Sequence, residues 1–393
     1  MRARAVICGI LGLLLAGSVP AFSTAAPQNS ARLPDPPHTL AEIPVYLAVD
    51  AGSGAVLAAR RPDLSFVPAS LTKVMSVYLA FELMAEGKLK PQQSFTFSSD
   101  SWKRWHDRGT GMHLKPGESV PVDALLHGMT TASANDACVA LAEGYAGSVE
   151  GWAMLMNAEA KRLGMRHSHF ASANGWPDGG QTYVSARDLV TLGEALIRRH
   201  PALYARYFGK KRMVWNGVTQ ENHDPAIGVI PGADGIKTGF THEAGYGFLG
   251  SAVRDGRRVL IVIGGAHSEA ERAEAARTLM AWSFAVWESR RVFVRRTPVA
   301  SAKVQGGAQR SVGLLASQDI AIAVPRGKPP QVRMTLRYRG PLVAPIRQGT
   351  EVAELEIAVA GLAPSRIPLV AATGVSEAGP FDRLRNGLAG LWE

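Results

Sequence analysis

Ser70 and Lys73 lie three residues apart, within the stretch of residues 68–75. Residues with this spacing share one face of a helix, about one turn apart. A serine hydroxyl becomes a good nucleophile when a neighbouring base takes its proton. Lys73 can be that base if it is neutral, and burial, a helix N-terminus or a second positive charge would each lower its pKa. The pair indicates nucleophilic acyl transfer, with a capping serine and a solvated lysine as the alternative.

A second polar motif places Ser133 and Asn135 before an apolar pattern over residues 139–145. Ser and Asn are common at turns and helix N-caps, which is the structural interpretation. Beside the Ser70 and Lys73 pair, the motif has a catalytic interpretation as well. A second hydroxyl can pass a proton between Lys73 and a leaving amine, and an amide can fix Lys73 and a substrate carbonyl.

Lys237, Thr238 and Gly239 form the third motif, which lies on or beside a predicted strand. A lysine and a hydroxyl there could bind a substrate carboxylate through charge-assisted hydrogen bonds. The glycine would let a substrate backbone pair along the strand edge. Lys237 would also supply the second positive charge that keeps Lys73 neutral. An ordinary strand end is the alternative.

Residues 1–26 have the three parts of a secretory signal peptide: a basic start, an apolar run over residues 5–17 and small residues before the cleavage point. The apolar run is short for a membrane span, and an uncleaved anchor is the alternative. We expect an exported chain that acts in the periplasm or at the outer face of the cytoplasmic membrane. Cleavage would leave Cys138 as the only cysteine, so no internal disulfide is expected.

The formal net charge of the chain is +10, and loss of Arg2 and Arg4 with the signal peptide lowers it to +8. A basic exported chain suits an anionic neighbourhood such as cell-wall polymer or lipid headgroups. No basic block with interleaved aromatic residues stands out, so nucleic acid is not an expected partner. His167 and His169 alone make a poor metal site, because zinc sites need three or four ligands. We predict no metal and no cofactor.

Strand pairs at the two ends of residues 45–290, with helices between them, predict an α+β catalytic domain. The strands are expected at residues 45–49 with 55–59 and at 246–253 with 259–263, the latter pair joined by a turn at Asp255 and Gly256. A buried helix should follow Ser70 and end near Gly87. Further helices are predicted over residues 152–163, from a capping box at Ser185 to about Arg199, and over 268–290. Residues 27–44 resemble a linker, and residues 88–128 look rich in loops.

Residues 291–379 have a different sequence pattern from residues 45–290, with short strand-like runs separated by Gly and Pro. This pattern predicts a small all-β domain without a catalytic cluster. The tail, residues 380–393, carries apolar residues at helical spacing. An amphipathic helix in peripheral contact with the inner membrane is one interpretation, and a packed or frayed terminus is the other.

The three motifs, in this order, resemble those of the serine penicillin-recognising enzymes. The nearest resemblance is to the low-molecular-mass penicillin-binding proteins, which are serine-type D-alanyl-D-alanine carboxypeptidases. Residues 114–117, 133–138, 234–239, 244–246 and 344–349 also match that pattern, so the resemblance runs from about residue 45 to residue 379. It implies a β-lactamase/transpeptidase-like domain, with an antiparallel sheet flanked by helices, followed by a small all-β domain.

The resemblance also implies a reaction on peptidoglycan stem pentapeptides and covalent inhibition by β-lactams. Ser70 would be acylated by the carbonyl of the penultimate D-alanine, with Lys73 as general base. The remaining carried-over roles are proton relay by Ser133, substrate positioning by Asn135, binding of the terminal carboxylate by Lys237, Thr238 and Gly239, an oxyanion hole from the backbone N–H groups of Ser70 and Phe240, and Arg272 near the mouth of the site.

Three alternatives share these motifs. A D,D-endopeptidase that cuts cross-links would use the same residues with a more open carboxylate end. A class A β-lactamase needs a glutamate on the loop after the Ser-x-Asn helix, and residues 164–180 contain none. A β-lactam sensor or an inactive wall-binding protein is the third, although sensors add transmembrane helices, and inactive binders lack a catalytic residue.

Overall fold

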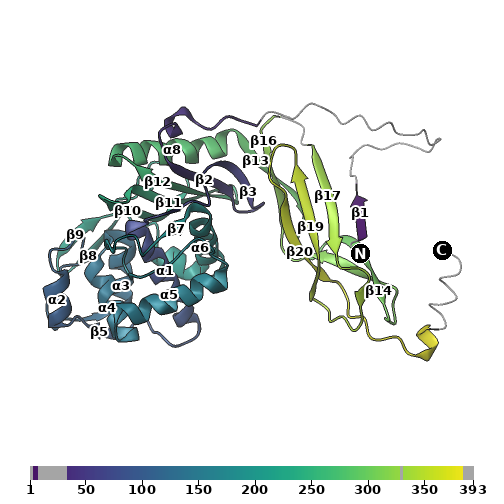
Figure 1. The fold of residues 1–393 in the computed structure, drawn as a ribbon, viewed down its shortest axis with the longest axis horizontal. Coiled ribbons are helices and arrows are strands. Elements are labelled where there is room, and N and C mark those ends of the chain that lie inside the picture. Colours follow the sequence, from purple (N-terminus) through teal and green to yellow (C-terminus); the bar gives the residue numbers. More distant parts are fainter. Residues whose placement is uncertain (1–2, 8–32, 328–330, 384–393) are drawn as a thin grey trace. The chain divides into compact units, whose positions relative to one another are not determined.

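The computed structural model describes residues 3–7, 33–327 and 331–383 (Figure 1). The chain forms two compact units: one comprises Pro36–Ala51 with Val56–Ala285, and the other is built mainly from the residues after Ala285. Most of the predicted signal peptide, residues 27–32 of the predicted linker and the tail beyond Arg383 lie outside the described residues. Within the predicted signal peptide, β1 (Ala3–Ile7) pairs with β17 (Val332–Tyr338).

The first unit is built on a five-stranded sheet in the order β10-β11-β12-β2-β3. The strands are β2 (Val45–Asp50), β3 (Ala55–Arg60), β10 (Ala233–Thr241), β11 (Gly245–Arg254) and β12 (Arg257–Ala266). The predicted strands and the turn at Asp255 are confirmed. The sheet joins distant parts of the chain, because β12 pairs antiparallel with β2, and β10 forms one edge.

Helices cover both faces of this sheet (Figure 1). On one face lies α8 (Glu269–Ala285), and on the other lie α1 (Lys73–Ala85) and α6 (Ala186–Arg199). Apolar side chains on nearly all sides of α1 are buried, as its sequence predicts. Ser185 accepts a hydrogen bond from the Asp188 backbone N–H, which confirms the capping box. Further helices of this unit are α4 (Asn135–Ala146), α5 (Val149–Leu163) and α7 (Pro201–Tyr207).

Residues 88–128 contain more regular structure than the loop-rich prediction allows. They form β5 (Ser94–Thr96), α2 (Ser99–Trp105), β6 (Ser119–Pro121) and α3 (Val122–His127). Ser98 caps α2 by accepting from the Ser101 backbone N–H, a signal that the many Gly and Trp residues obscured. Two short strand pairs also belong to this unit, β4 (Ser65–Phe66) with β7 (Val184–Ser185) and β8 (Arg212–Trp215) with β9 (Val218–Glu221). The helical turn η3 (Gly128–Ala132) follows α3.

The predicted helix over residues 268–290 was too long. It ends at Ala285, and β13 (Trp287–Phe293) begins two residues later. Trp287 is fully buried and opposes Pro325 in the β13 pairing with β16 (Ile320–Pro325). Strand pairing therefore takes the residues after the Ala-rich stretch out of the helix.

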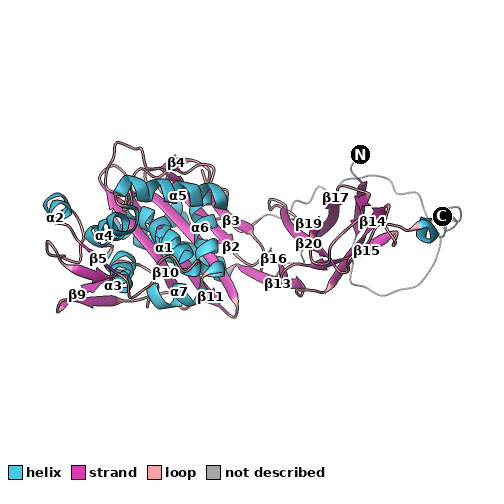
Figure 2. Ribbon diagram, turned by 90° about the horizontal axis from the view of Figure 1, so that it is seen from below, coloured by secondary structure: helices cyan, strands magenta, loops and turns pink. Residues whose placement is uncertain are grey.

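The second unit is all-β, as predicted. Its main sheet contains seven strands in the order β1-β17-β19-β20-β15-β14-β18, and β13 and β16 form a separate pair (Figure 2). The remaining strands are β14 (Pro298–Gln305), β15 (Ser311–Ala316), β18 (Leu342–Val343), β19 (Glu351–Val359) and β20 (Ser365–Ala371).

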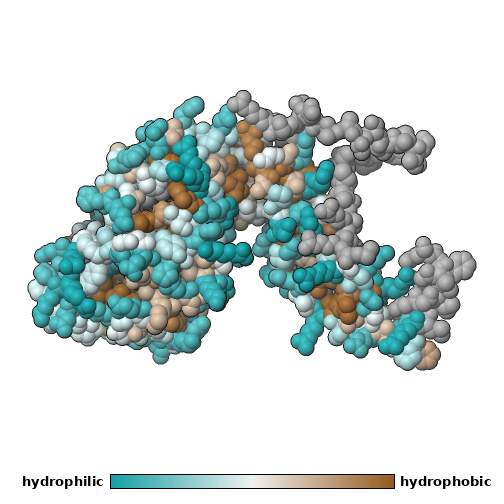
Figure 3. All heavy atoms as spheres, in the orientation of Figure 1, coloured by the Kyte–Doolittle hydropathy of each residue, from teal (hydrophilic) through white to brown (hydrophobic). Residues whose placement is uncertain are grey.

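Hydrophilic side chains cover much of the surface in the view of Figure 3, with hydrophobic residues visible between them. Each unit has its own buried apolar cluster. Among the described residues, no helix combines the length and the hydropathy that crossing a membrane requires.

Candidate active site

Ser70 lies in η2 (Ala69–Thr72), a short 3-10 helix that leads directly into α1 at Lys73. This junction brings the two side chains together, and Lys73 Nζ lies 2.8 Å from Ser70 Oγ. The Lys73 side chain is almost completely buried, with 1% of the residue exposed. Burial lowers its pKa to about 8, against the opposing effects of Cys138 and Asp136. The short distance and the lowered pKa are the two properties that a general base beside a serine requires.

A second hydrogen bond holds Lys73 from the loop that follows α5. Lys73 Nζ donates to the backbone carbonyl of Asn174 at 2.9 Å. The next residue, Gly175, has φ +79°, and a Cβ at this position would overlap the backbone oxygen of Ala69. Glycine therefore lets this loop approach the turn that carries the nucleophile. The sequence predicted only a turn here, because a backbone carbonyl has no residue-type signature.

Ser133 and Asn135 reach the same region from the start of α4. Ser133 adopts a left-handed conformation with φ +59°, and Thr110 Oγ1 donates to its carbonyl at 2.7 Å. Asn135 Nδ2 donates to the Arg108 carbonyl at 2.9 Å. Both predicted residues line the cavity. Lys73 Nζ donates its hydrogen bonds to Ser70 and to the Asn174 carbonyl, and to neither of these two residues.

The third motif lies on the edge strand β10. Lys237 is 4% exposed, and its Nζ donates to the Thr238 carbonyl at 3.0 Å. Burial keeps the pKa of Lys237 well below its usual value, and the charge of Lys73 lowers it further. We had expected the charge of Lys237 to keep Lys73 neutral, but the dominant cause at Lys73 is burial.

Gly239 has a different structural role from the one that the sequence suggested. A Cβ on Gly239 would lie 2.6 Å from the Pro68 carbonyl oxygen and 3.2 Å from the Leu71 backbone nitrogen. The missing side chain therefore allows β10 to pack against η2, the turn that carries Ser70. The predicted contact with a substrate backbone stays a prediction.

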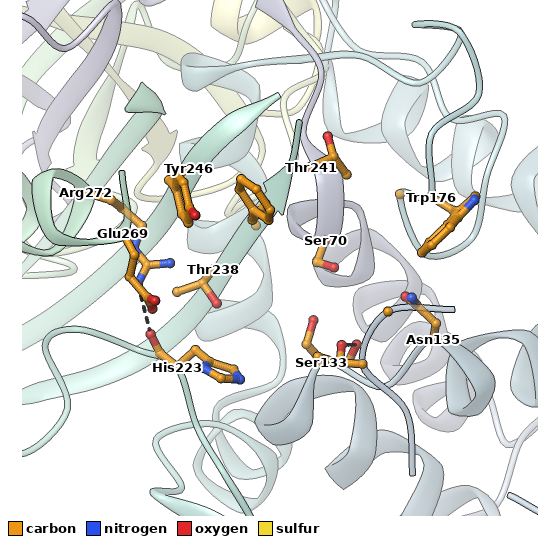
Figure 4. Close-up of a pocket in the computed structure, with 15 residues that line it drawn as sticks. Ser70, Ser133, Asn135, Trp176, His223, Thr238, Thr241, Tyr246, Glu269 and Arg272 are labelled. Carbon is orange, nitrogen blue, oxygen red and sulfur yellow. Dashed lines mark hydrogen bonds and ion pairs between the residues drawn. The ribbon is translucent and has the colours of Figure 1, made fainter. Parts of the chain in front are cut away.

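These elements enclose a cavity of about 330 Å³. In Figure 4, Ser70 lies between Ser133 and Asn135 on one side and Thr238 on the other. Phe240 is 44% exposed and stacks on Tyr246 with ring centroids 4.1 Å apart. The cavity is lined by Ser70, Gly109, Thr110, Ser133, Asn135, Gly175, Trp176, His223, Thr238, Gly239, Phe240, Thr241, Tyr246, Glu269 and Arg272.

Arg272 on α8 lies at the far end of the cavity from Asn135 (Figure 4). Its side chain is largely buried, and its Nη2 contacts the Glu269 carboxylate at 2.9 Å and the His223 carbonyl at 3.4 Å. Arg272 makes this the cationic end of the cavity, beside the Thr238 hydroxyl and with the Glu269 carboxylate paired to it. Lys237 is buried next to Thr238 in the chain and is not among the residues that line the cavity. Trp176, His223 and Glu269 were not selected as site residues from the sequence, because no motif marks the two loops or the start of α8 that carry them.

A serine next to a buried lysine, with a cationic end to the cavity, defines an acyl-transfer site of the serine hydrolase type. The D-alanyl-D-alanine carboxypeptidase family (peptidase S11) matches residues 34–268, and the C-terminal domain family of penicillin-binding protein 5 matches residues 287–377. The chain therefore belongs to the D-alanyl-D-alanine carboxypeptidase family, whose members are serine hydrolases.

Individual relatives cover most of the chain. The D-alanyl-D-alanine carboxypeptidase DacA of Escherichia coli (strain K12) is 32% identical over 86% of this chain and 85% of its own length. The crystal structure of penicillin binding protein 5 from Haemophilus influenzae has a TM-score of 0.77 at 29% identity and covers 88% of this chain and 100% of that one. Penicillin-binding protein D2 from Listeria monocytogenes, solved in an ampicillin-bound form, has a TM-score of 0.56 at 29% identity. The match covers 62% of this chain and 97% of that one.

Proposed function

We propose that this protein removes the terminal D-alanine from peptidoglycan stem pentapeptides through an acyl-enzyme on Ser70. The observation that carries the proposal is the 2.8 Å contact between Ser70 Oγ and the buried Nζ of Lys73, in a cavity that Thr238 and Arg272 also line. The carboxypeptidase names of the relatives supply the substrate class. The reaction is a hydrolysis by acyl transfer and uses no cofactor.

In the first step, neutral Lys73 accepts the proton of Ser70 while Ser70 Oγ attacks the carbonyl of the penultimate D-alanine. The negative charge that develops on the carbonyl oxygen is stabilised by the backbone N–H groups of Ser70 and Phe240. Loss of one such donor costs about 2.7–4 kcal/mol in acyl-transfer enzymes. Ser133 passes the proton to the leaving D-alanine nitrogen, and water then hydrolyses the ester.

The cationic end of the cavity explains why the enzyme would remove the last residue of the peptide. Lys237 and Thr238 bind the carboxylate of the last D-alanine, and Arg272 adds positive charge behind them. Asn135 holds the peptide on the opposite side of Ser70 (Figure 4). A free carboxylate satisfies these groups, whereas an internal peptide bond does not, which favours carboxypeptidase over endopeptidase action.

The protein acts outside the cytoplasm, in the periplasm or at the outer face of the cytoplasmic membrane, because residues 1–26 have the pattern of a cleaved signal peptide. It serves cell-wall biogenesis and cell shape, and the tail, residues 380–393, contacts the membrane peripherally. Sedimentation of the full chain and of a chain ending at residue 379 with anionic vesicles tests the membrane contact. Equal binding of the two would contradict it.

The central experiment incubates the purified protein with a stem pentapeptide and, separately, with cross-linked peptide dimers, and identifies the products by mass. Release of one D-alanine from the pentapeptide is the expected result. Cleavage of the dimers alone would replace the proposal with an endopeptidase.

β-Lactams are expected to acylate Ser70 and to remain attached. After peptide cleavage the free D-alanine departs and water can enter from its side, but the leaving group of an opened β-lactam stays tethered. Residues 164–180 offer no glutamate to activate water elsewhere. Single-turnover measurements of both esters distinguish the two outcomes: penicillin hydrolysis as fast as peptide turnover would make this chain a β-lactamase.

A further inference from the structure

The loop that follows α5 presents two consecutive backbone carbonyls, those of Ala173 and Asn174, to α1. Lys73 Nζ donates to the Asn174 carbonyl at 2.9 Å. Ser76 lies three residues further along α1, and its hydroxyl donates to the Ala173 carbonyl at 2.6 Å. Both side chains are buried, with 1% of Lys73 and 0% of Ser76 exposed. The two residues of α1 therefore hold adjacent peptide units of the same loop.

Trp152 on α5 sets the direction of the Ser76 hydroxyl. Trp152 Nε1 lies 3.1 Å from Ser76 Oγ, and an indole N–H can only donate. Ser76 Oγ therefore accepts from Trp152 and keeps its own proton for an acceptor. The Ala173 carbonyl at 2.6 Å is a nearer and stronger acceptor than the Met156 thioether at 3.4 Å. A chain of hydrogen bonds thus runs from α5 through α1 to the loop.

Two other side chains hold the same stretch of backbone. Ser172 Oγ accepts from the backbone N–H groups of Asn174 at 3.3 Å and Gly175 at 2.9 Å. Cys138 Sγ on α4 lies 3.0 Å from the Ala173 carbonyl, but a thiol is a weak donor. The loop itself therefore holds the N–H end of both peptide units, whereas the stronger hydrogen bond to the Ala173 carbonyl comes from the Ser76 hydroxyl.

The direction of the Asn174 carbonyl matters for the chemistry of Lys73. A neutral amine must turn its lone pair toward Ser70 to accept the proton. A carbonyl can only accept, so the Asn174 oxygen binds an N–H of Lys73 both before and after that transfer. Holding one N–H in this way leaves the rest of the amine for Ser70 Oγ, which lies 2.8 Å away. A fixed Asn174 carbonyl therefore orients the amine for proton transfer.

We propose that Ser76 is a positioning residue for acylation, because its hydroxyl holds the Ala173 carbonyl and thereby aims the next carbonyl, that of Asn174, at Lys73. The inference rests on the proposed function, since it requires that Lys73 takes the proton of Ser70. Ser76 is not among the residues that line the cavity, so it acts through the loop and not on the substrate. A displacement of about 1 Å at a reacting group can cost about 10² in rate. Loss of the Ser76 hydroxyl should therefore slow the chemical step and leave substrate binding nearly unchanged.

The test follows acylation of the full-length protein by a fluorescent penicillin at several concentrations. The concentration dependence separates the dissociation constant of the noncovalent complex from the rate constant of acylation. Ser76→Ala removes the hydroxyl. Ser76→Thr and Ser76→Val form a matched pair, because their side chains are similar in shape and only threonine carries a hydroxyl.

Ser283→Ala is the control for the loss of a buried hydroxyl elsewhere. Ser283 on α8 is as buried as Ser76, and its Oγ donates to the Leu279 carbonyl of the same helix at 2.8 Å. The control therefore loses a comparable hydrogen bond that does not involve the loop. Thermal unfolding shows whether each variant is folded.

We expect the acylation rate constant of Ser76→Ala and Ser76→Val to fall by about tenfold or more, with little change in the dissociation constant. Ser76→Thr and Ser283→Ala should keep a rate constant close to that of wild type. Equal rate constants for Ser76→Thr and Ser76→Val would overturn the inference, as would a fall confined to noncovalent binding.

Unfolding of both Ser76→Ala and Ser76→Val would overturn it as well, because the hydroxyl would then serve the fold and not the reaction. The proposed function fails if the wild-type protein is not acylated at all. A wild-type rate constant in Ser76→Ala, measured beside an active wild-type protein, refutes the inference alone.

Discussion

The two sides of the cavity differ in how far their polar groups are satisfied. On the nucleophile side, Lys73 has two hydrogen-bond partners, Ser70 and the Asn174 carbonyl. On the cationic side, Lys237 donates to the carbonyl of its own neighbour, and the Nε of Arg272 is buried without a partner. Both lysines are almost completely buried, so the difference lies in their partners and not in their exposure.

This difference indicates separate tasks for the two sides. The nucleophile side is complete as it stands, which suits a base that must be aligned before the substrate arrives. On the cationic side, Lys237 donates to a neighbouring carbonyl and Arg272 Nε has no partner, which suits a surface that a substrate carboxylate completes. Variants on the first side should therefore reduce the chemical step, and variants on the second should weaken substrate binding.

The largest effect is expected from Ser70→Ala. It removes the oxygen that forms the ester, so covalent labelling by a fluorescent penicillin should vanish and peptide hydrolysis should fall to background. The labelled peptide from wild type, identified by mass spectrometry, should contain Ser70. A label on another residue would refute the assignment of the nucleophile.

Lys73→Arg should come next. Arginine keeps the positive charge but does not deprotonate in proteins, so no base remains beside Ser70. Loss of general base catalysis typically costs about 10²–10⁴ in rate, and noncovalent substrate binding should change less. Wild-type acylation should rise with pH through about 8, where Lys73 becomes neutral, and the variant should lack that rise. Acylation at nearly the wild-type rate would exclude Lys73 as the base.

Lys237→Gln tests the other side. The variant loses a charge-assisted hydrogen bond to the substrate carboxylate, a group of interactions worth about 1.5–3 kcal/mol. We expect KM for a D-alanyl-D-alanine peptide to rise between about 10- and 100-fold, with a smaller change in kcat. A fall confined to kcat would place Lys237 in the chemical step and remove the distinction between the two sides.

The sequence was sufficient to predict the side chains on both sides but not the backbone that holds them. Ser70, Lys73, Ser133, Asn135 and the Lys237 motif were found because their chemistry depends on residue type and spacing. The Asn174 carbonyl was missed because every residue has one, and its direction depends on how a loop packs. The α+β sheet and the all-β unit were predicted from short apolar runs separated by Gly, Pro and turn residues.

Tertiary contacts decided the features that local patterns could not reveal. The turn at residues 222–227 has no distinctive sequence pattern, and only the structure shows that Arg272 and Arg277 hold it against α8. The sequence could not show that Gly239 also lets β10 pack against Pro68, and its contact with a substrate stays a prediction. The end of α8 was misjudged because burial of Trp287 in a strand overrides the helical preference of the preceding alanines.

Two glycines in one loop provide a smaller, matched test of how the nucleophile side is held. Gly175 and Gly179 both have positive φ, but only at Gly175 would a Cβ meet other atoms, those of Ala69 and Thr72. Alanine in this conformation costs about 1–2 kcal/mol by itself, so both variants should lose roughly that stability. Gly175→Ala should lose more and should also slow acylation about tenfold, because Ser70 and the Asn174 carbonyl are displaced. Equal behaviour of the two variants in unfolding and acylation assays would contradict this close packing.

The smallest effect is expected from Phe240→Ala, which separates the backbone of this residue from its side chain. The proposed oxyanion hole uses only the Phe240 N–H, and alanine retains it. The ring is 44% exposed and its main ordered contact is the stack on Tyr246, which is worth about 0.5–1.5 kcal/mol. Acylation should therefore fall by less than about tenfold, whereas loss of an oxyanion donor costs about 10²–10³. A fall of that larger size in a folded Phe240→Ala protein, measured with penicillin and with a stem peptide, would mean that the side chain itself supports the transition state. The oxyanion hole would then depend on the aromatic pair at the cationic side, and the nucleophile side would no longer be complete without it.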